Sequence, residues 1–541
     1  MSLALKSRSI LLAASLLSAG FARTAEESFS VATMFSDHMV LQRDKPVRVW
    51  GLAPVGSRVV VTFAGASVEG IAATNGDWCV ELPAQPVRKT GMSLTVTPSV
   101  GSPVVFTDVL VGDVWLMAGQ SNMEFPFRKS TGAAAWASKA DGRRNIRQLR
   151  VRQARAILPR TDAACDGWRV CTSNALMTTD VSGVGYACVC ELNGATDVPQ
   201  GIIETHWGGC LIEPFISLEG YRSVPDLAVP YVTDIERARA RHSRDRYLWK
   251  DRQDKIIEYA DYLRQCRAER REPDLLPFKH IAFEGFDPFY GTAYNAMIAP
   301  LTRLPIAGCF WYQGESNIGC RIYDKFMKAL AFGWRTAWGD DFPIYVCQRS
   351  SVEKAVIDLS KNNTCARFRD LQRRMIPGLG KSGLVVTTDV GADYEHPENK
   401  IDVGLRCARW ALRDLYGRDV VPTGPMFKGF VREGSRLRAS FDFAKGLMAA
   451  EKDPQAPGVP PVRKATNKVR GFAVYGEDNQ WHLASAEIDG ETVVVWAEGV
   501  KRPRELRYAH FSNTIGLADL YNGEGLPAAA FRTDDQDWQN K

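Results

Sequence analysis

The stretch Val111-Gly-Asp-Val-Trp-Leu-Met-Ala-Gly-Gln-Ser-Asn-Met-Glu124 decides the fold of this chain of 541 residues. Its first half is a short apolar run, which is typical of a strand buried on both faces. Gly119 then permits a sharp turn, and Ser121 falls just beyond the strand, where a helix can begin. The stretch therefore predicts a strand–turn–helix unit that places a serine at the carboxyl edge of a sheet.

Similar apolar runs recur through the middle of the chain and alternate with helical stretches. They cover residues 201–205, 308–312 and 384–388. Short apolar strands that alternate with helices predict the α/β class, with a parallel sheet covered by helices on both faces. We assign residues 109–420 to this α/β domain.

Strand-like runs separated by turn signals flank the α/β part on both sides. They predict an N-terminal β-sandwich domain over residues 26–108 and a C-terminal β domain over residues 421–541. A charge-dense helical stretch over residues 231–275 interrupts the α/β part. Its acidic and basic residues are interleaved, so we expect a solvated helical insertion rather than a nucleic-acid-binding face.

The composition is that of a soluble globular protein, with 45% hydrophobic and 24% charged residues. It excludes a disordered tail protein, a collagen-like chain and a polytopic membrane protein. The length favours three or more domains. The net charge of +6 is scattered along the chain, so no nucleic-acid partner is predicted.

The amino terminus has the pattern of a secretory signal peptide. Lys6 and Arg8 precede an apolar run over residues 10–22, and small residues stand where a signal peptidase cleaves. The run is too short to span a bilayer of about 30 Å. We therefore predict a signal peptide over residues 1–22, export to the periplasm or the extracellular space, and no membrane insertion after its removal.

Metal and cofactor motifs are missing from the sequence. The twelve cysteines contain no Cys-x-x-Cys pair, and the seven histidines are too far apart for a convincing zinc set. The sequence holds neither a P-loop nor a dinucleotide-binding glycine pattern. In an exported protein, Cys165 with Cys171 and Cys309 with Cys320 could form local disulfides.

Polar residues follow several of the predicted strands, at the edge where open α/β sheets bind their ligands. Ser121 is a candidate nucleophile there, although a serine in this position is also a common helix N-cap. His396 follows a later strand, and a carboxylate three residues earlier, Asp393, can fix the imidazole tautomer that makes it a base. Asp389 is the alternative carboxylate.

Two further strand ends could supply hydrogen-bond donors. The Gln313 side chain could donate to an oxyanion, unless residues 311–317 form an ordinary polar loop. Gly208 and Gly209 could present free backbone N–H groups, or could form a plain Gly-Gly turn.

Seven blocks of sequence, taken together and in this order, resemble the sialate O-acetylesterase family of the SGNH-hydrolase superfamily. They are Leu41-Gln-Arg43, Gly119-Gln-Ser-Asn-Met-Glu124, Trp207-Gly-Gly209, Tyr294-Asn-Ala-Met-Ile-Ala-Pro-Leu301, Trp311-Tyr-Gln-Gly-Glu-Ser316, His396-Pro-Glu-Asn-Lys400 and Gly525-Leu-Pro-Ala528. The resemblance covers nearly the whole chain after the signal peptide. It implies an SGNH-type catalytic domain accompanied by β domains.

The resemblance also implies the roles of the site residues. Ser121 is implied to attack an acetyl carbonyl with His396 as general base, and we assign Asp393 as the third catalytic residue. The oxyanion is implied to bind the N–H groups of Ser121, Gly208 and Gly209 and the side chain of Gln313. The residues assigned to substrate binding are Gln120, Asn122, Glu213 and Glu315. No metal or organic cofactor is implied.

The family name implies an acetylated sialic acid as substrate, whereas related exported esterases act on acetylated plant polysaccharides such as xylan. A sialate carboxylate would pair with an arginine near Ser121, and Arg128 and Arg147 lie within sequence reach. Two other functions are weighed against deacetylation. One is a non-catalytic carbohydrate-binding protein on the same fold, and the other is a lipid acyl hydrolase, for which residues 231–275 are too charged to form an apolar lid.

Overall fold

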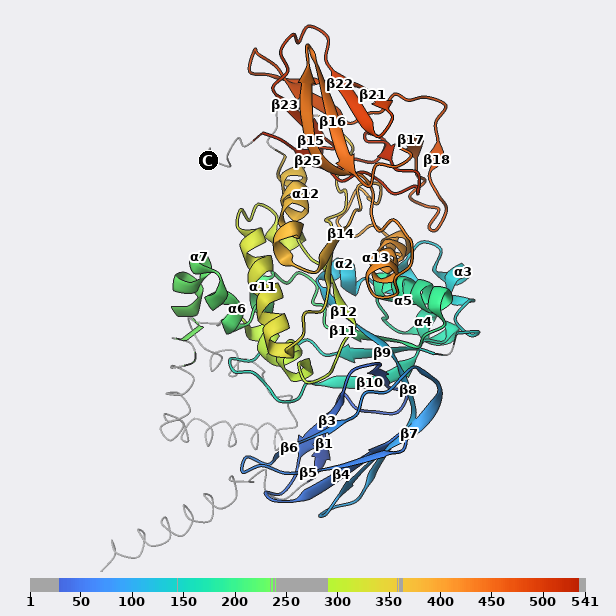
Figure 1. The fold of residues 1–541 in the computed structure, drawn as a ribbon, viewed down its shortest axis with the longest axis vertical. Helices are drawn as coiled ribbons and strands as arrows, with labels where there is room; N and C mark the ends of the chain where they lie inside the picture. Colours follow the sequence, from blue (N-terminus) through green and yellow to red (C-terminus); the bar gives the residue numbers. More distant parts are fainter. Residues whose placement is uncertain are drawn as a thin grey trace, which may run out of the picture.

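The computed structural model describes residues 29–143, 145–233, 235–236, 239, 290–357, 359 and 363–534. The predicted signal peptide and most of the predicted insertion lie outside the described residues. No helix in these ranges is long and apolar enough to cross a membrane. Figure 1 shows an elongated molecule in which a central α/β part lies between an N-terminal and a C-terminal β part. The prediction of an α/β domain with β domains on both sides is thus confirmed at the level of architecture.

The central sheet has the strand order β10-β9-β11-β8-β12-β13-β14. Its strands are β8 (Val104–Gly119), β9 (Ile146–Val151), β10 (Cys165–Val170), β11 (Gln200–Glu204), β12 (Gly308–Tyr312), β13 (Ile344–Cys347) and β14 (Ser382–Val385). β11 and β12 flank β8 in parallel, and β10 pairs with β9 antiparallel at one edge. The sheet is therefore mixed, with a parallel centre.

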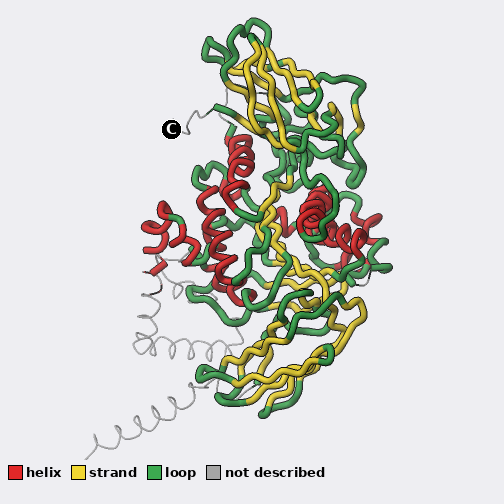
Figure 2. The backbone as a smooth tube through the Cα atoms, in the orientation of Figure 1, coloured by secondary structure: helices red, strands yellow, loops and turns green. Residues whose placement is uncertain are grey.

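Successive side chains of β8 point to opposite faces of this sheet, and each face is covered by helices (Figure 2). Leu116 belongs to the core shared with α6 (Leu218–Ser223), α11 (Tyr323–Trp338) and α12 (Thr364–Met375). Met117 belongs to the core shared with α5 (Gly183–Thr196) and α13 (Lys400–Asp414). The unbroken apolar run is thus explained by burial of β8 on both faces.

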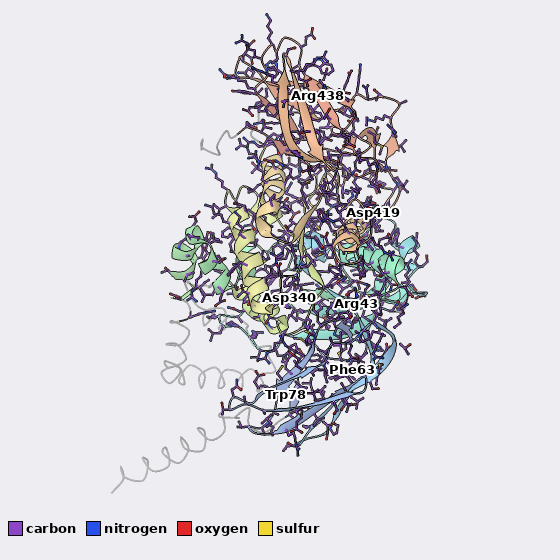
Figure 3. All side chains as sticks on the ribbon, in the orientation of Figure 1. Arg43, Phe63, Trp78, Asp340, Asp419 and Arg438 are labelled. Carbon is purple, nitrogen blue, oxygen red and sulfur yellow. The ribbon has the colours of Figure 1, made fainter. Side chains whose placement is uncertain are left out.

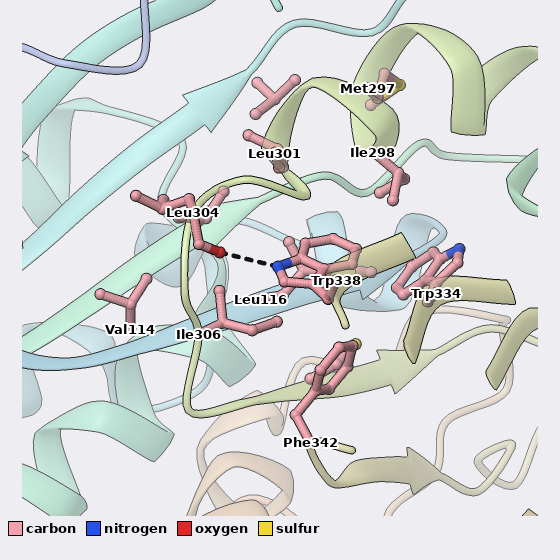
Figure 4. Packing of buried hydrophobic residues seen from close by; sticks show 14 of the residues in the cluster. Val114, Leu116, Met297, Ile298, Leu301, Leu304, Ile306, Trp334, Trp338 and Phe342 are labelled. Atoms are coloured by element: carbon pink, nitrogen blue, oxygen red, sulfur yellow. Dashed lines mark hydrogen bonds between the residues drawn. The ribbon is translucent and has the colours of Figure 1, made fainter. Parts of the chain in front are cut away.

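The core beneath α11 is rich in tryptophan (Figure 4). Trp334 and Trp338 pack there, and Trp338 Nε1 donates to the carbonyl oxygen of Leu304 over 2.9 Å. A buried indole needs such an acceptor, because an unsatisfied N–H would cost stability. Much of the aromatic content of the chain is therefore used for packing.

The N-terminal β part is continuous with the central sheet through the long strand β8. Its first half pairs with β2 (Val40–Gln42) and β7 (Arg88–Pro98), and β4 (Arg58–Phe63) and β5 (Ala66–Ile71) extend this layer. A second layer holds β1 (Ser30–Val31), β3 (Val47–Leu52) and β6 (Asp77–Leu82). β8 therefore crosses the position at which the sequence predicted a domain boundary.

The block Leu41-Gln-Arg43 forms hydrogen bonds between the N-terminal β part and the central sheet, and Figure 3 labels its Arg43. Arg43 Nε and Gln42 Nε2 each lie 2.9 Å from Oδ1 of the buried Asp113 on β8. The hydroxyl of Tyr416 donates to its other carboxylate oxygen over 2.5 Å. A buried carboxylate is tolerated only when it is paired and hydrogen-bonded, so this block joins the two parts of the chain.

The C-terminal β part contains three small sheets. Their orders are β15-β16-β22-β21, β20-β19-β23-β25 and β18-β17-β24. The strands are β15 (Met426–Glu433), β16 (Arg436–Asp442), β17 (Met448–Glu451), β18 (Val462–Arg463), β19 (Phe472–Tyr475), β20 (Trp481–Leu483), β21 (Ser485–Asp489), β22 (Thr492–Trp496), β23 (Glu505–Tyr508), β24 (Leu520–Tyr521) and β25 (Phe531–Arg532). They enclose a core of their own.

Neither of the two possible local disulfides forms, because every cysteine in the described ranges is a free thiol. Cys165 begins β10 and Cys171 follows its end, so the two are more than about 15 Å apart along the chain direction. Cys309 is buried near the start of β12, whereas Cys320 lies beyond the carboxyl end of that strand. In each pair, one cysteine lies in a strand and the other lies beyond the end of that strand, so the extended backbone keeps the two sulfur atoms apart.

Candidate active site

The turn after β8 brings Ser121 to the carboxyl edge of the sheet. Gly119 has a φ of +133°, and a Cβ atom at this position would lie 2.2 Å from the carbonyl oxygen of Tyr312. Only glycine allows β8 to pass so close to the end of β12 and then turn. The short helix α2 (Ser121–Glu124) follows, and its cap position is Gln120, so Ser121 is not the N-cap.

Gln120 lies beneath this turn rather than in an open substrate site. Its side chain is buried, and Oε1 accepts hydrogen bonds from the N–H groups of Gly314 and Ser316 over 3.4 and 3.2 Å. Its Nε2 lies 3.5 Å from Ser121 Oγ. Gln120 therefore joins the Ser121 turn to the loop after β12.

Asn122, which the sequence assigned to substrate binding, is fully buried. Its Nδ2 donates to Glu315 Oε1 over 2.7 Å and to the carbonyl oxygen of Glu395 over 3.0 Å. Its Oδ1 accepts a hydrogen bond of 2.5 Å from Lys400 Nζ. Both polar atoms of the Asn122 side chain are therefore hydrogen-bonded to other residues of the protein. Glu315 is also buried, with Oε1 on Asn122, and its assignment to substrate binding stays a prediction.

The loop that carries His396 reaches the Ser121 turn through this contact. The carbonyl that accepts from Asn122 belongs to Glu395, the residue directly before His396. The His396 side chain is half-buried, and Asp393 is exposed. No hydrogen bond within the described ranges joins Asp393 to His396. Asp389, the alternative carboxylate, is paired on both oxygens with Arg406 at 2.6 and 2.8 Å and is not available.

The Gly208–Gly209 loop lies directly beside Ser121. The N–H of Trp207 donates to the carbonyl oxygen of Gly119 over 2.9 Å, which fixes the loop against the turn. A Cβ atom on Gly208 would lie 3.6 Å from Ser121 Cβ. The N–H of Gly208 is bonded to Glu124 Oε2 at 2.6 Å, so it is not free.

Glu124 connects this loop to the arginine that the structure places near Ser121. Arg150, at the carboxyl end of β9, donates to Glu124 Oε1 over 2.9 Å. The two arginines suggested by sequence distance lie elsewhere. Arg147 is paired with Asp108 at 3.0 Å, and Arg128 is paired with Asp180 at 2.8 Å.

Asn317 forms hydrogen bonds with both Gln313 and Glu213, two of the predicted site residues. Its Oδ1 accepts from Gln313 Nε2 over 2.7 Å, and its Nδ2 donates to Glu213 Oε2 over 3.0 Å. Gln313 Nε2 also donates to the carbonyl oxygen of Cys210 over 3.2 Å. Gln313 could therefore donate to an oxyanion only by exchanging one of these bonds. Glu213 is half-buried and held by the same network.

Lys400, near the site, is a lysine whose side chain is buried and whose pKa is lowered. Its side chain is fully buried, and burial lowers its pKa to about 7 although Glu315 opposes this shift. The ammonium lies 5.0 Å from the ring centre of Phe125 and 5.7 Å from that of Tyr312. The sequence assigned no role to Lys400, Glu124 or Asn317, although each stands in or directly beside one of the seven blocks.

Within the described ranges there is no group of three or more His, Cys, Asp or Glu side chains that could hold a metal ion. A cavity of about 540 Å³ lies between the start of the His396 loop, at Asp389, and the strands β17 and β18. Ser121 does not line it.

Comparisons with known proteins agree with the resemblance of the sequence. No protein-family model matches the chain. The chain is 26% identical to rat (Rattus norvegicus) sialate O-acetylesterase over 343 residues, 59% of this chain and 58% of the rat protein. It is 28% identical to human (Homo sapiens) sialate O-acetylesterase over 451 residues, 75% of this chain and 74% of the human protein. It thus spans less than two thirds of the rat protein.

A solved structure covers almost the whole chain. The crystal structure of a carbohydrate acetylesterase from Xanthomonas citri superposes with a TM-score of 0.74 at 27% sequence identity. The match covers 94% of this chain and 99% of that one.

Proposed function

This chain belongs to the sialate O-acetylesterase family, and on that premise we propose that it is a carboxylic ester hydrolase that removes O-acetyl groups from glycans. The observation that carries the proposal is the hydrogen bond from Asn122 to Glu395, which holds the His396 loop against the Ser121 turn. A serine and a histidine carried by adjoining loops at the carboxyl edge of an α/β sheet would suit nucleophilic acyl transfer.

In the proposed reaction, Ser121 Oγ attacks the acetyl carbonyl carbon while His396 accepts the hydroxyl proton. The tetrahedral intermediate collapses, the bond to the sugar oxygen breaks, and His396 returns the proton to that oxygen. Water then attacks the acetyl-serine, again with His396 as base, and acetate leaves. Asp393 as the third catalytic residue stays a prediction, and its exposure favours a smaller role than that of His396.

Two backbone donors are available for the oxyanion. In the described part of the chain, the N–H groups of Ser121 and Gly209 carry no hydrogen bond, and both residues are accessible. Gly208 and Gln313 could contribute after Glu124 or Cys210 is displaced. Loss of one oxyanion donor typically lowers kcat by about 10²–10³-fold.

The substrate proposed is an O-acetylated carbohydrate, with acetylated sialic acid as the first candidate and acetylated xylan as the alternative. The relatives are named for sialate, and the structural neighbour is titled only a carbohydrate acetylesterase. The half-buried indole of Trp207 beside Gly208 supports a sugar-binding surface next to Ser121. Export is part of the proposal and rests on residues 1–22.

The test is acetate release by the purified protein from an O-acetylated sialoglycan and from acetylated xylan in parallel. Release from either substrate, abolished by Ser121→Ala, supports the proposal and identifies the glycan. Release from neither, with the fold intact, would contradict it and favour a non-catalytic carbohydrate-binding protein.

A further inference from the structure

The amide of Asn122 lies between a buried cation and a buried anion. Its Oδ1 faces Lys400 Nζ at 2.5 Å, and its Nδ2 faces Glu315 Oε1 at 2.7 Å. Lys400 is 0% exposed and Glu315 is 8% exposed. The two charges therefore act on the amide with little screening by water.

These charges determine which way the amide points. A carbonyl oxygen is attracted to an ammonium, and an NH₂ group is attracted to a carboxylate. If the amide of Asn122 were reversed while Lys400 carries its proton, NH₂ would face the ammonium and the oxygen would face Glu315, and both contacts would be repulsive. Only the observed orientation satisfies both neighbours.

The same orientation creates the contact between the Ser121 turn and the His396 loop. With Nδ2 directed toward Glu315, its second hydrogen reaches the carbonyl oxygen of Glu395 at 3.0 Å. Asn122 directly follows Ser121, and Glu395 directly precedes His396. The direction of one amide thus sets a contact between the residues that adjoin Ser121 and His396 in sequence.

We propose that Lys400 and Glu315 are positioning residues of the esterase, which orient the Asn122 amide so that His396 is held at Ser121. The inference rests on the proposed function. Both side chains are buried, so we expect them to act through the geometry of the Ser121–His396 pair rather than through contact with substrate. Their loss should lower kcat and leave KM nearly unchanged.

The first experiment compares Lys400→Met with Lys452→Met on a chromogenic acetyl ester. Lys452 is a matched control because it is also buried, but it pairs with Asp402 at 3.1 Å and contacts neither Asn122 nor His396. We expect kcat to fall about 10²-fold for Lys400→Met, since a misplacement of about 1 Å costs that much, with KM and Tm near wild type. Lys452→Met should keep the wild-type kcat.

The second experiment removes the carboxylate with the isosteric Glu315→Gln, alone and combined with Lys400→Met. Because both residues act on one amide, the double variant should lose little more kcat than Lys400→Met alone. Glu315→Gln also tests the inference if Lys400→Met fails to fold.

The possible outcomes separate this inference from the proposed function. An active wild type whose kcat is unchanged in Lys400→Met or Glu315→Gln would overturn the positioning role alone. Losses that multiply in the double variant, or that appear equally in Lys452→Met, would overturn it as well. A wild type inactive on every acetyl ester would overturn both.

Discussion

Asn122 Nδ2 donates to the carbonyl oxygen of Glu395 over 3.0 Å, across 273 positions of sequence. The bond joins the residue after Ser121 to the residue before His396. Asn122 is fully buried and its bond to Glu395 is partly buried, and a buried polar group that loses its partner costs about 1–3 kcal/mol, so the contact favours one relative placement of the two loops.

Replacing Ser121 with alanine should abolish acetyl release and leave the fold intact. Ser121 is half-buried and removal of its hydroxyl leaves no large cavity, so Tm should change little. Without the nucleophile, kcat should fall by about 10³-fold or more. Steady-state acetate release and a thermal melt of the same preparation measure both effects. Retained activity would exclude Ser121 as nucleophile.

Asp393→Asn should cost far less activity than His396→Ala. Asp393 is exposed and has no hydrogen bond to His396 in the described structure, so we expect a loss of kcat/KM below about 10-fold. Removal of a general base typically costs about 10²–10⁴-fold, which is the loss expected for His396→Ala. Equal losses in the two variants would establish Asp393 as a full member of the catalytic triad.

Gly208→Ala should lower activity without lowering stability. Its backbone does not need a positive φ, but the added Cβ would lie 2.9 Å from Glu124 Oε2 and would displace that carboxylate beside Ser121. We expect kcat/KM to fall by about 10-fold or more while Tm stays near wild type. Gly209→Ala is the comparison variant. Gly209 has a φ of +71°, which alanine adopts with strain, so this substitution should lower the free energy of unfolding by about 1 kcal/mol. An unchanged kcat/KM in Gly208→Ala would contradict the placement of this loop.

Lys400→Met should change how stability depends on pH. The pKa of Lys400 is lowered to about 7 in the folded protein by burial, whereas an unfolded lysine keeps its proton to about pH 10. Between these values the unfolded state binds more protons, so the free energy of unfolding of wild type rises with pH. The methionine variant lacks this contribution.

The stability of wild type relative to Lys400→Met should therefore increase by about 2 kcal/mol between pH 7 and pH 9. Chemical denaturation of both proteins at the two pH values measures the difference. Parallel pH dependence of the two proteins would mean that Lys400 keeps its proton in the folded state over this range, and the predicted difference in slope would be absent.

Much of the architecture could be predicted because it depends on local patterns of apolar and turn-forming residues. The apolar run before Gly119 predicts a strand buried on both faces, and β8 is such a strand. The sequence left the disulfide pairing open, and the two possible local pairs do not form because an extended strand separates cysteines that are close in sequence. Sequence distance also suggested the wrong arginine near Ser121. The pairing of β9 with β11 places Arg150 opposite Glu204, at the carboxyl end of the sheet, whereas Arg147 lies opposite Gly201, farther from that end.

By itself, the sequence determined the Ser121 turn, the α/β class, the flanking β parts and the order of the blocks that make up the site. Only the tertiary structure decided what each polar residue does. Asn122 was expected to bind substrate and is instead enclosed by Lys400 and Glu315. The physical reason is that burial and the partners of a charged group arise from contacts between distant segments, whereas strand and turn propensities act between neighbours in the chain.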